Sequence, residues 1–205
     1  MSIIAIMNSK GGAGKTATAL NLIYHLKKNA TVRVADLDVH SGISNINTLN
    51  REDPLEILTP KTKAQLLMIL KSDNDEDFTV FDCGGYDDEL TSLAIANANL
   101  IIIAANEDPI EQFAIRDCNT RLHELSHQIN KHLVGYVLLN RVHHLQRKFD
   151  GFDSLIENFN HIERLSVTIP FSKKIPKAQE TGQALKNGAI AARYAALATK
   201  IKGLR

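Results

Sequence analysis

The residues best suited to chemistry lie in a glycine-rich segment near the start of the chain. Residues 9–16 read SKGGAGKT, and they follow an apolar run of strand length and precede a helical pattern. Glycines let backbone N–H groups approach phosphate oxygens, and the N-terminus of a helix adds positive potential. In a loop of this kind Lys15 contacts the β- and γ-phosphates, and the Thr16 hydroxyl binds Mg²⁺. The segment therefore predicts a site for the phosphates of a nucleotide.

Three carboxylates are placed to complete such a site. Asp36 and Asp38 follow one strand pattern two residues apart, so both side chains point the same way. Asp82 ends the next strand pattern and is the acid expected to hold Mg²⁺ through water. Ligands of open α/β sheets bind outside the carboxyl ends of the strands. We therefore expect all three acids near the phosphate loop.

Short apolar runs alternate with helical patterns along the whole chain. The runs are continuous, as in parallel strands that are covered on both faces. They are expected to be strands at residues 3–7, 32–35, 78–81, 100–105, 133–139 and 166–169. Helical spacing of apolar residues occurs over 19–26, 110–125 and 190–201. This alternation predicts one domain, residues 1–205, with a doubly wound and mostly parallel α/β sheet flanked by helices.

The composition fits a globular chain inside the cell. Hydrophobic residues make up 44% and charged residues 23% of the 205 residues, which argues against extended disorder. No run approaches the roughly 18 apolar residues that span a bilayer, and no signal peptide begins the sequence. The two cysteines, Cys83 and Cys118, cannot form a disulfide framework. We therefore expect a reducing, cytoplasmic compartment.

Residues 10–16, KGGAGKT, resemble the deviant Walker motif of the ParA/MinD family of P-loop ATPases. The resemblance covers residues 2 to about 198 and implies hydrolysis of ATP with Mg²⁺ as cofactor. It implies that Lys10 reaches across a two-fold axis to the nucleotide of a partner subunit. ATP would then hold a homodimer together, and hydrolysis would dissolve it. The catalytic residues implied are Lys10, Lys15 and Asp38, with Asp38 positioning the attacking water.

The same resemblance assigns the other residues around the nucleotide. Asp36 lies near the metal, Asn140 reads the adenine edge through its amide, and Pro170 belongs to a segment that lines the base. A turn-forming asparagine is the alternative for Asn140. The loop contacts are Lys10, Gly11, Gly12, Ala13, Gly14, Lys15, Thr16 and Ala17, and the metal contacts are Thr16, Asp36 and Asp82. The sequence departs from the family pattern at residues 39–40, Val-His in place of Pro-Gln, and at residues 83–86, Cys-Gly-Gly-Tyr.

The last part of the chain carries an excess of positive charge. From Phe171 to Arg205 there are eight basic residues and one acidic residue. This is either a solvated face of terminal helices or an electrostatic footprint for nucleic acid or an anionic membrane. The candidates for contact with DNA are Lys173, Lys174, Lys177, Lys186 and Arg193.

Together these features predict a short partition ATPase of the ParA type, without an N-terminal helix-turn-helix. Its ATP dimer is expected to bind double-stranded DNA without sequence preference and to be nucleoid-associated in that form. By resemblance, a centromere-binding, ParB-like adaptor stimulates a slow intrinsic hydrolysis. The alternatives are a MinD-like switch on the membrane, positioning of a cargo other than DNA, and a metabolic ligase of the same superfamily. No stable membrane insertion is expected, because residues 200–205 contribute only two large apolar side chains.

Three weaker signals have plain structural explanations. His123 and His127 have a spacing compatible with zinc, but no third ligand accompanies them, so we expect solvated or packing histidines. Cys83 beside Asp82 is expected to be a small buried residue rather than a redox-sensitive one. Residues 73–77, DNDED, are expected to form a solvated loop before a strand.

Overall fold

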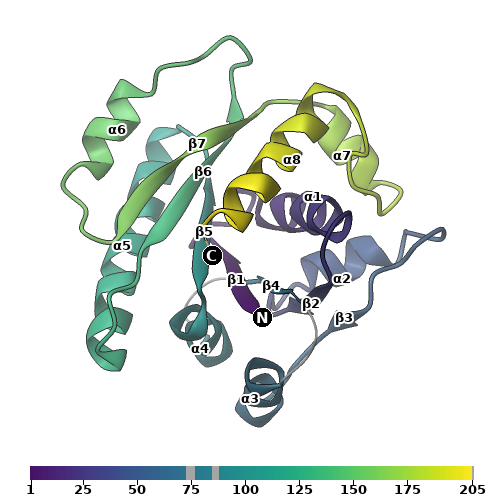
Figure 1. The fold of residues 1–205 in the computed structure, drawn as a ribbon. Helices are drawn as coiled ribbons and strands as arrows, with labels where there is room; N and C mark the ends of the chain where they lie inside the picture. The colour runs from purple at the N-terminus through teal and green to yellow at the C-terminus, as the bar shows by residue number, and fades with distance from the viewer. Residues whose placement is uncertain (73–76, 85–87, 205) are drawn as a thin grey trace.

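The computed structural model describes residues 1–72, 77–84 and 88–204, which form one sheet with helices on both faces (Figure 1). The sheet has seven strands in the order β3-β2-β4-β1-β5-β6-β7, and all neighbouring strands are parallel. The strands are β1 (Ser2–Met7), β2 (Val32–Asp36), β3 (Ile57–Leu58), β4 (Phe78–Asp82), β5 (Leu100–Ala105), β6 (Gly135–Val142) and β7 (Ile162–Pro170). The chain proceeds to β2 and β4 on one side of β1 and then crosses to β5 on the other. The loop after β1 therefore stands at the topological switch point, where open α/β sheets bind ligands.

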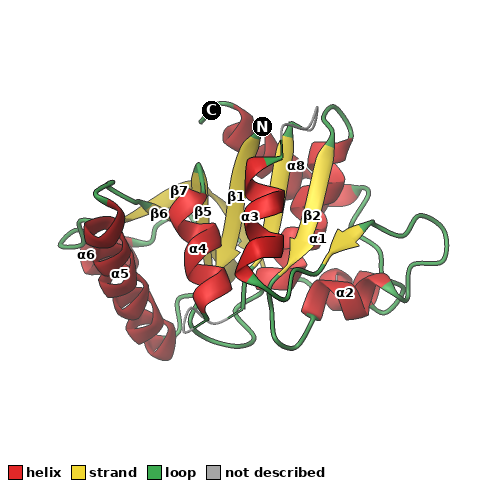
Figure 2. Cartoon of the chain, turned by 90° about the horizontal axis from the view of Figure 1, so that it is seen from below, coloured by secondary structure: helices red, strands yellow, loops and turns green. Residues whose placement is uncertain are grey.

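Helices cover both faces of the sheet (Figure 2). One face is covered by α3 (Lys63–Lys71), α4 (Glu89–Asn97), α5 (Pro109–Ile129) and α6 (Asp150–Ile156). The other is covered by α1 (Lys15–Lys27) and α8 (Gly188–Lys202), which pack on each other, with α2 (Gly42–Asn47) and α7 (Lys174–Gln179) beside α1. None of the helices in the described ranges is long and apolar enough to cross a bilayer.

β1 shows why the strands read as continuous apolar runs. Successive side chains of a strand point to opposite faces of the sheet. Ile3, Ala5 and Met7 join the core cluster under α3 to α6. Ile4 and Ile6 join the cluster under α1 and α8. Because both faces are buried, every position after Ser2 in this strand is apolar.

The structure confirms the predicted parallel α/β sheet and corrects its details. β5 has the expected bounds, whereas β6 begins and ends later than the run at 133–139, and β7 is longer than the run at 166–169. The two-residue strand β3 and the helices α2, α3, α4, α6 and α7 were not predicted. Residues 73–76 of the expected acidic loop, residues 85–86 of the segment at 83–86, and Arg205 lie outside the described residues.

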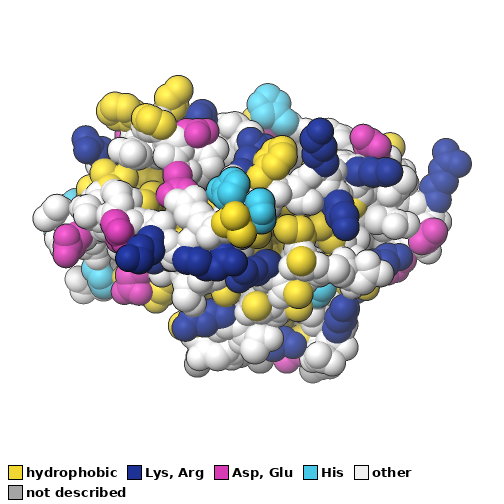
Figure 3. Space-filling model, turned by 90° about the horizontal axis from the view of Figure 1, so that it is seen from above, with side chains coloured by type: hydrophobic (Ala, Val, Ile, Leu, Met, Phe, Trp, Pro, Cys, Tyr) yellow, Lys and Arg dark blue, Asp and Glu magenta, His cyan; other side chains and the backbone are white. Residues whose placement is uncertain are grey.

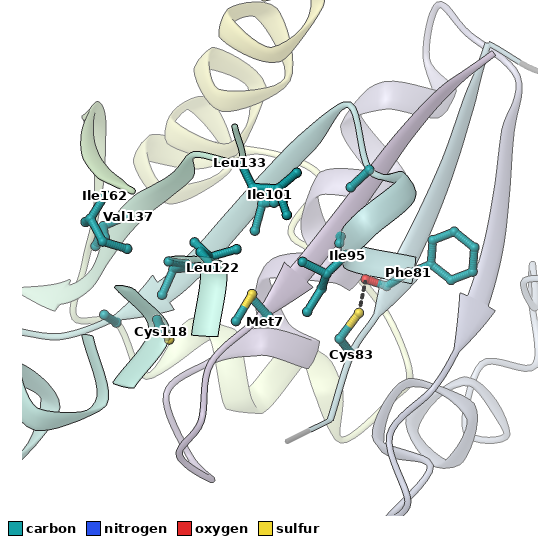
Figure 4. Close-up of a cluster of buried hydrophobic side chains, with 14 of the residues drawn as sticks. Met7, Phe81, Cys83, Ile95, Ile101, Cys118, Leu122, Leu133, Val137 and Ile162 are labelled. Atoms are coloured by element: carbon teal, nitrogen blue, oxygen red, sulfur yellow. Dashed lines mark hydrogen bonds between the residues drawn. The ribbon is translucent and has the colours of Figure 1, made fainter. Parts of the chain in front are cut away.

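Both cysteines are free thiols within the apolar core (Figure 4). Cys83 and Cys118 are fully buried, and the Cys83 thiol lies 3.9 Å from the carbonyl oxygen of Phe81. Burial raises the pKa of the Cys118 thiol to about 12 and raises the pKa of the Cys83 thiol well above its ordinary value. Thiols that stay protonated behave as small apolar side chains, which confirms the expectation for Cys83.

The packing of α1 against the sheet and α8 is tested by Leu22. This side chain is fully buried in the same cluster as Tyr194 and Leu197 of α8. Leu22→Ala should lower the free energy of unfolding by about 2–5 kcal/mol, because it removes buried methyl groups and leaves a cavity. The control Met68→Ala, at a side chain that is 72% exposed on α3, should change it by less than about 0.5 kcal/mol. Urea unfolding followed by circular dichroism measures both, and equal effects would contradict this packing.

Candidate functional site

The segment after β1 turns over the end of the sheet and enters α1. Gly12 and Gly14 have φ angles of 80° and 95°, a backbone region that residues with a Cβ rarely adopt. A Cβ on Gly14 would lie 3.0 Å from the amide nitrogen of Asn140. Gly14 is also the N-cap of α1 and provides no side-chain cap. The N–H groups of the first helical turn are therefore placed to bind an anion.

The two lysines of the loop have different partners. Lys15 is 8% exposed, and its Nζ donates to the carbonyl oxygen of Lys10 at 3.1 Å. Lys10 Nζ forms an ion pair at 3.2 Å with Oε1 of Glu111, a residue of α5 that is 1% exposed. Asn8 donates to Oε2 of Glu111 at 3.1 Å and accepts a hydrogen bond from the Lys10 N–H at 2.9 Å. The start of α5 therefore fixes the beginning of the loop and holds Lys10 within its own chain.

The strand register brings the predicted acids together. Asp36 of β2 and Asp82 of β4 are paired at the ends of neighbouring parallel strands. Asp82 is fully buried, and neither of its carboxylate oxygens has a hydrogen-bond partner among the described residues. Burial raises the pKa of Asp82 to about 7; Asp36 and Asp38 raise it as well, whereas Thr16 and Lys15 oppose the shift. A buried carboxylate without a partner is unfavourable when ionised, and a bound cation would relieve this cost.

Asp36 and Asp38 have different surroundings. Asp36 is buried and accepts hydrogen bonds from the Asp38 N–H at 3.0 Å and from the N–H and hydroxyl of Ser44 at 3.1 and 2.6 Å. Its carboxylate therefore positions the start of α2. Asp38 is half-buried and accepts a hydrogen bond from the His40 N–H at 2.8 Å. A Cβ on Gly84 would lie 3.1 Å from the Cα of Asp38, so the segment after β4 approaches Asp38 closely.

The surroundings of Asp82 fit a magnesium ion that is held largely by water and phosphate. In the described ranges no group of three or more His, Cys, Asp or Glu side chains is arranged to hold a metal ion by itself. Mg²⁺ beside phosphates usually keeps several waters and takes few protein ligands. The Thr16 hydroxyl and the partnerless oxygens of Asp82 match that requirement. Asp36 is already occupied by Ser44, so its influence on a metal would be indirect.

A pocket of about 180 Å³ lies beside the loop and contains the predicted base-binding residues. It is lined by Gly14 and Ala17 at the start of α1, by Asn140, by Pro170 and by residues of α7. Asn140 is 5% exposed, and its amide nitrogen donates to the carbonyl oxygen of Ala13 at 3.3 Å. The buried amide oxygen of Asn140 has no partner in the described part of the chain. The amide therefore joins the phosphate loop to the pocket.

A family model for the CobQ/CobB/MinD/ParA nucleotide binding domain matches residues 4–185. The chain belongs to this family. Its sequence finds no match among curated proteins. The matched residues include the loop with both Lys10 and Lys15.

Solved structures show the fold of this family member. A Borrelia burgdorferi protein assigned to plasmid partition and bound to AMPPNP has a TM-score of 0.75 at 15% identity, covering 98% of this chain and 99% of that one. An McdA variant from Cyanothece in complex with ATP has a TM-score of 0.73 at 14% identity over 100% and 97% of the two chains. MinD from Pyrococcus horikoshii with Mg-ADP has a TM-score of 0.67 at 17% identity over 99% and 96%. At these identities the likeness concerns the fold alone.

The basic residues predicted to contact DNA differ in this ParA/MinD family member. Lys173, Lys174 and Lys177 are exposed at or beside α7, and none forms an ion pair with a described residue. Lys186 Nζ lies 3.6 Å from a carboxylate oxygen of Glu52. Arg193 is half-buried on α8. Figure 3 shows Lys and Arg side chains spread over the face that includes α7 and α8.

The helical histidines have a neighbour that the sequence did not reveal. His123 Nδ1 lies 3.2 Å from His161 Nε2, and His161 Nδ1 lies 2.8 Å from the carbonyl oxygen of Leu133. The ring centroid of His132 is 4.7 Å from that of His161. The fold thus brings His161, the residue before β7, beside α5. His123 and His127 pack against each other, and His123 hydrogen-bonds to His161, as the expectation of packing histidines requires. In the described residues they are not part of a group arranged to hold a metal ion.

Sequence reasoning missed three residues that position the site. Glu111 and Asn8 hold Lys10, and Ser44 holds Asp36. The Asn8–Glu111 contact joins residues 103 positions apart, so no local spacing indicates it. A signal was present all the same: Asn8 directly precedes the loop, and Glu111 lies in the first turn of the helix predicted from residue 110.

The closeness of Gly42 to Thr16 gives a test of the metal-binding hydroxyl. A Cβ on Gly42 would lie 2.7 Å from Thr16 Oγ1. Gly42→Ala should displace that hydroxyl and weaken Mg²⁺-dependent binding of ADP by about tenfold, or roughly 1.4 kcal/mol. Titration calorimetry with and without Mg²⁺ measures the effect. Gly151→Ala, where a Cβ meets nothing within 4 Å, is the control and should leave both affinities unchanged. An equal loss with and without Mg²⁺ would contradict the assignment.

Proposed function

We propose that residues 1–205 form one ATPase domain, which binds ATP with Mg²⁺ and hydrolyses it. The observation that carries this proposal is the loop between β1 and α1, where the buried Lys15 and the start of α1 face the partnerless carboxylate of Asp82. Membership of the nucleotide-binding family supports it. Relatives with the same fold hold AMPPNP, ATP or Mg-ADP.

In this proposal the chain's own groups bind and orient the nucleotide. Lys15 and the N–H groups of residues 11–16 hold the phosphates, and Thr16 and Asp82 hold the metal, Asp82 through water. When bound, Mg²⁺ neutralises charge that develops on the phosphates. Asp38 orients the attacking water, since it lies two residues after the end of β2 and is more exposed than Asp36. Asn140 and Pro170 hold the adenine in the pocket beside the loop.

Lys10 would act on the nucleotide of a second subunit, in a homodimer that depends on ATP. In the single chain Lys10 is paired with the buried carboxylate of Glu111. A contact in trans requires Lys10 to leave that carboxylate, so dimer formation exchanges one anionic partner for another. The γ-phosphate carries more negative charge than the Glu111 carboxylate, so it can attract Lys10 away. When ATP is hydrolysed, the γ-phosphate is lost and Lys10 returns to Glu111.

The exposed lysines at α7 support DNA segregation as the cellular function. Lys173, Lys174 and Lys177 are exposed cations without acidic partners in the described residues, and a two-fold dimer doubles their number. Such a surface suits binding to double-stranded DNA without sequence preference and association with the nucleoid in the ATP form. A ParB-like adaptor at the centromere would stimulate the slow hydrolysis and release the protein. Positioning of a cargo other than DNA uses the same cycle.

The DNA proposal is tested by fluorescence anisotropy with a random-sequence duplex, with ATP, ADP or no nucleotide, at two salt concentrations. Tight, salt-sensitive binding is expected with ATP alone. Each of Lys174→Ala and Lys177→Ala should lower the salt slope by about 1, because each lysine meets a phosphate. Lys61→Ala, an exposed lysine beside α3, is the matched control and should not change it. Absence of binding in every nucleotide state would overturn the DNA proposal and favour a membrane or another cargo.

Removal of the Asp38 carboxylate separates hydrolysis from binding. Asp38→Ala should lower ATP turnover by about 100-fold or more, because the attacking water loses its orienting group. The affinity for ATP should stay within about threefold, so the variant accumulates as an ATP-bound dimer. Phosphate release and light scattering measure the two effects. Asp150→Ala, at an exposed acid of α6, serves as the control. Normal turnover in the Asp38 variant would remove the role assigned to this residue.

A further inference from the structure

The short helix α7 has two faces with different neighbours. Ile175, Ala178 and Gln179 are half-buried and face the molecule, whereas Lys174 and Lys177 are exposed on the other side. None of the residues of α7 is buried. In contrast, α8 buries Tyr194, Leu197 and Ile201 against the core, among others. α7 therefore has little apolar packing of its own to hold it in place.

The inner face of α7 forms one wall of the pocket assigned to the base. Lys173, Ile175, Pro176 and Gln179 line this pocket of about 180 Å³, opposite Gly14 and Ala17 of the loop and α1. A planar base that fills the pocket would contact this wall and add the apolar packing that α7 lacks in the single chain. The phosphates, in contrast, are held by residues 11–16, which belong to the connection between β1 and α1. Base and phosphates thus act on different elements.

We propose that the base of the nucleotide packs α7 in place, and that α7 thereby presents Lys174 and Lys177 as a fixed pair to an anionic partner, the phosphates of duplex DNA. The inference rests on the proposed function for both its ligand and its partner. It deepens that function by giving the base-binding wall a part in DNA contact, whereas the difference between ATP and ADP stays with the dimer. DNA contact then responds to occupancy of the pocket through the same helix, in addition to any effect of dimer formation. Binding to the two faces is linked, so each ligand favours the arrangement that the other needs.

Hydrogen–deuterium exchange of the whole chain separates the effect of the base from that of the phosphates. The samples are the protein without ligand, with Mg²⁺ and tripolyphosphate, and with Mg-ADP, which avoids the dimer that ATP would form. Residues 10–16 should be protected by both ligands, whereas amides of residues 171–180 should exchange about tenfold more slowly with ADP alone. Equal protection of 171–180 by tripolyphosphate would overturn the inference. So would unchanged exchange of 171–180 with ADP while residues 10–16 are protected.

Two variants of α7 test its two faces separately. Gln179→Ala removes a pocket-facing side chain and should reduce the slowing of residues 171–180 by ADP, with residues 10–16 still protected. Lys177→Ala is the matched change on the outer face and should leave both protections intact while weakening DNA binding by the ATP form. If ADP slows exchange of residues 171–180 in the Gln179 variant as much as in the wild type, the proposed contact between the base and α7 is overturned. If ADP protects both segments normally in the Lys177→Ala variant, and this variant still binds DNA as tightly as the wild type, then base binding and DNA binding are not linked through Lys177.

These outcomes distinguish the inference from the proposal beneath it. Lack of protection of residues 10–16 by both ADP and tripolyphosphate would overturn nucleotide binding itself, and the inference with it. DNA binding that requires ATP, together with unprotected residues 171–180 under ADP, would leave the partition function standing and remove the role of α7.

Discussion

Parallel pairing of β2, β4 and β1 places the chemistry of this protein, because it fixes three strand ends at one edge of the sheet. Asp36 pairs with Asp82, and Asp82 in turn pairs with Ile6, one residue before the end of β1. The loop that follows β1 therefore begins beside both acids. Parallel strands need crossover helices, and helices on both faces bury the central strands β4, β1 and β5 almost completely. Polar groups can then gather only where the strands end, which is where the loop, the acids and the pocket lie.

Concentrating charge at that edge leaves the site electrostatically incomplete in the single chain. Three carboxylates converge near Lys15, yet the oxygens of Asp82 have no hydrogen-bond partner among the described residues. Burial raises the pKa of Asp82 to about 7, so keeping this group ionised costs free energy. A divalent cation with phosphates would remove much of that cost. The carboxylates that make this edge costly to bury are thus the groups that would favour a bound cation.

The sequence predicted the parts of this site that depend on local pattern. The loop, the strand ends with Asp36 and Asp82, and the position of Asn140 all follow from residues that are close together in the chain. Contacts between distant elements could not be predicted this way, and the pair of Lys10 with Glu111 is an example. Short elements could not be predicted for a different reason. β3 has two residues, and α7 has six, which is fewer than two turns of a helix, so neither shows a periodic pattern. The third histidine beside His123 also needed the fold, because it comes from the residue before β7.

The apolar residues of α8 bear on whether this helix itself could bind a membrane. A helix that binds a bilayer in its plane must expose an apolar face beside basic residues. In α8 the large apolar side chains Tyr194, Leu197 and Ile201 are no more than 2% exposed, and they pack with residues of α1 and the sheet. Membrane binding through this face would require α8 to leave the core and expose the cluster around Leu22, at a cost of several kcal/mol. The lysines of α7 need no such rearrangement, since they are exposed already. Binding of phosphates by these lysines, as proposed above, therefore needs no loss of packing in α8.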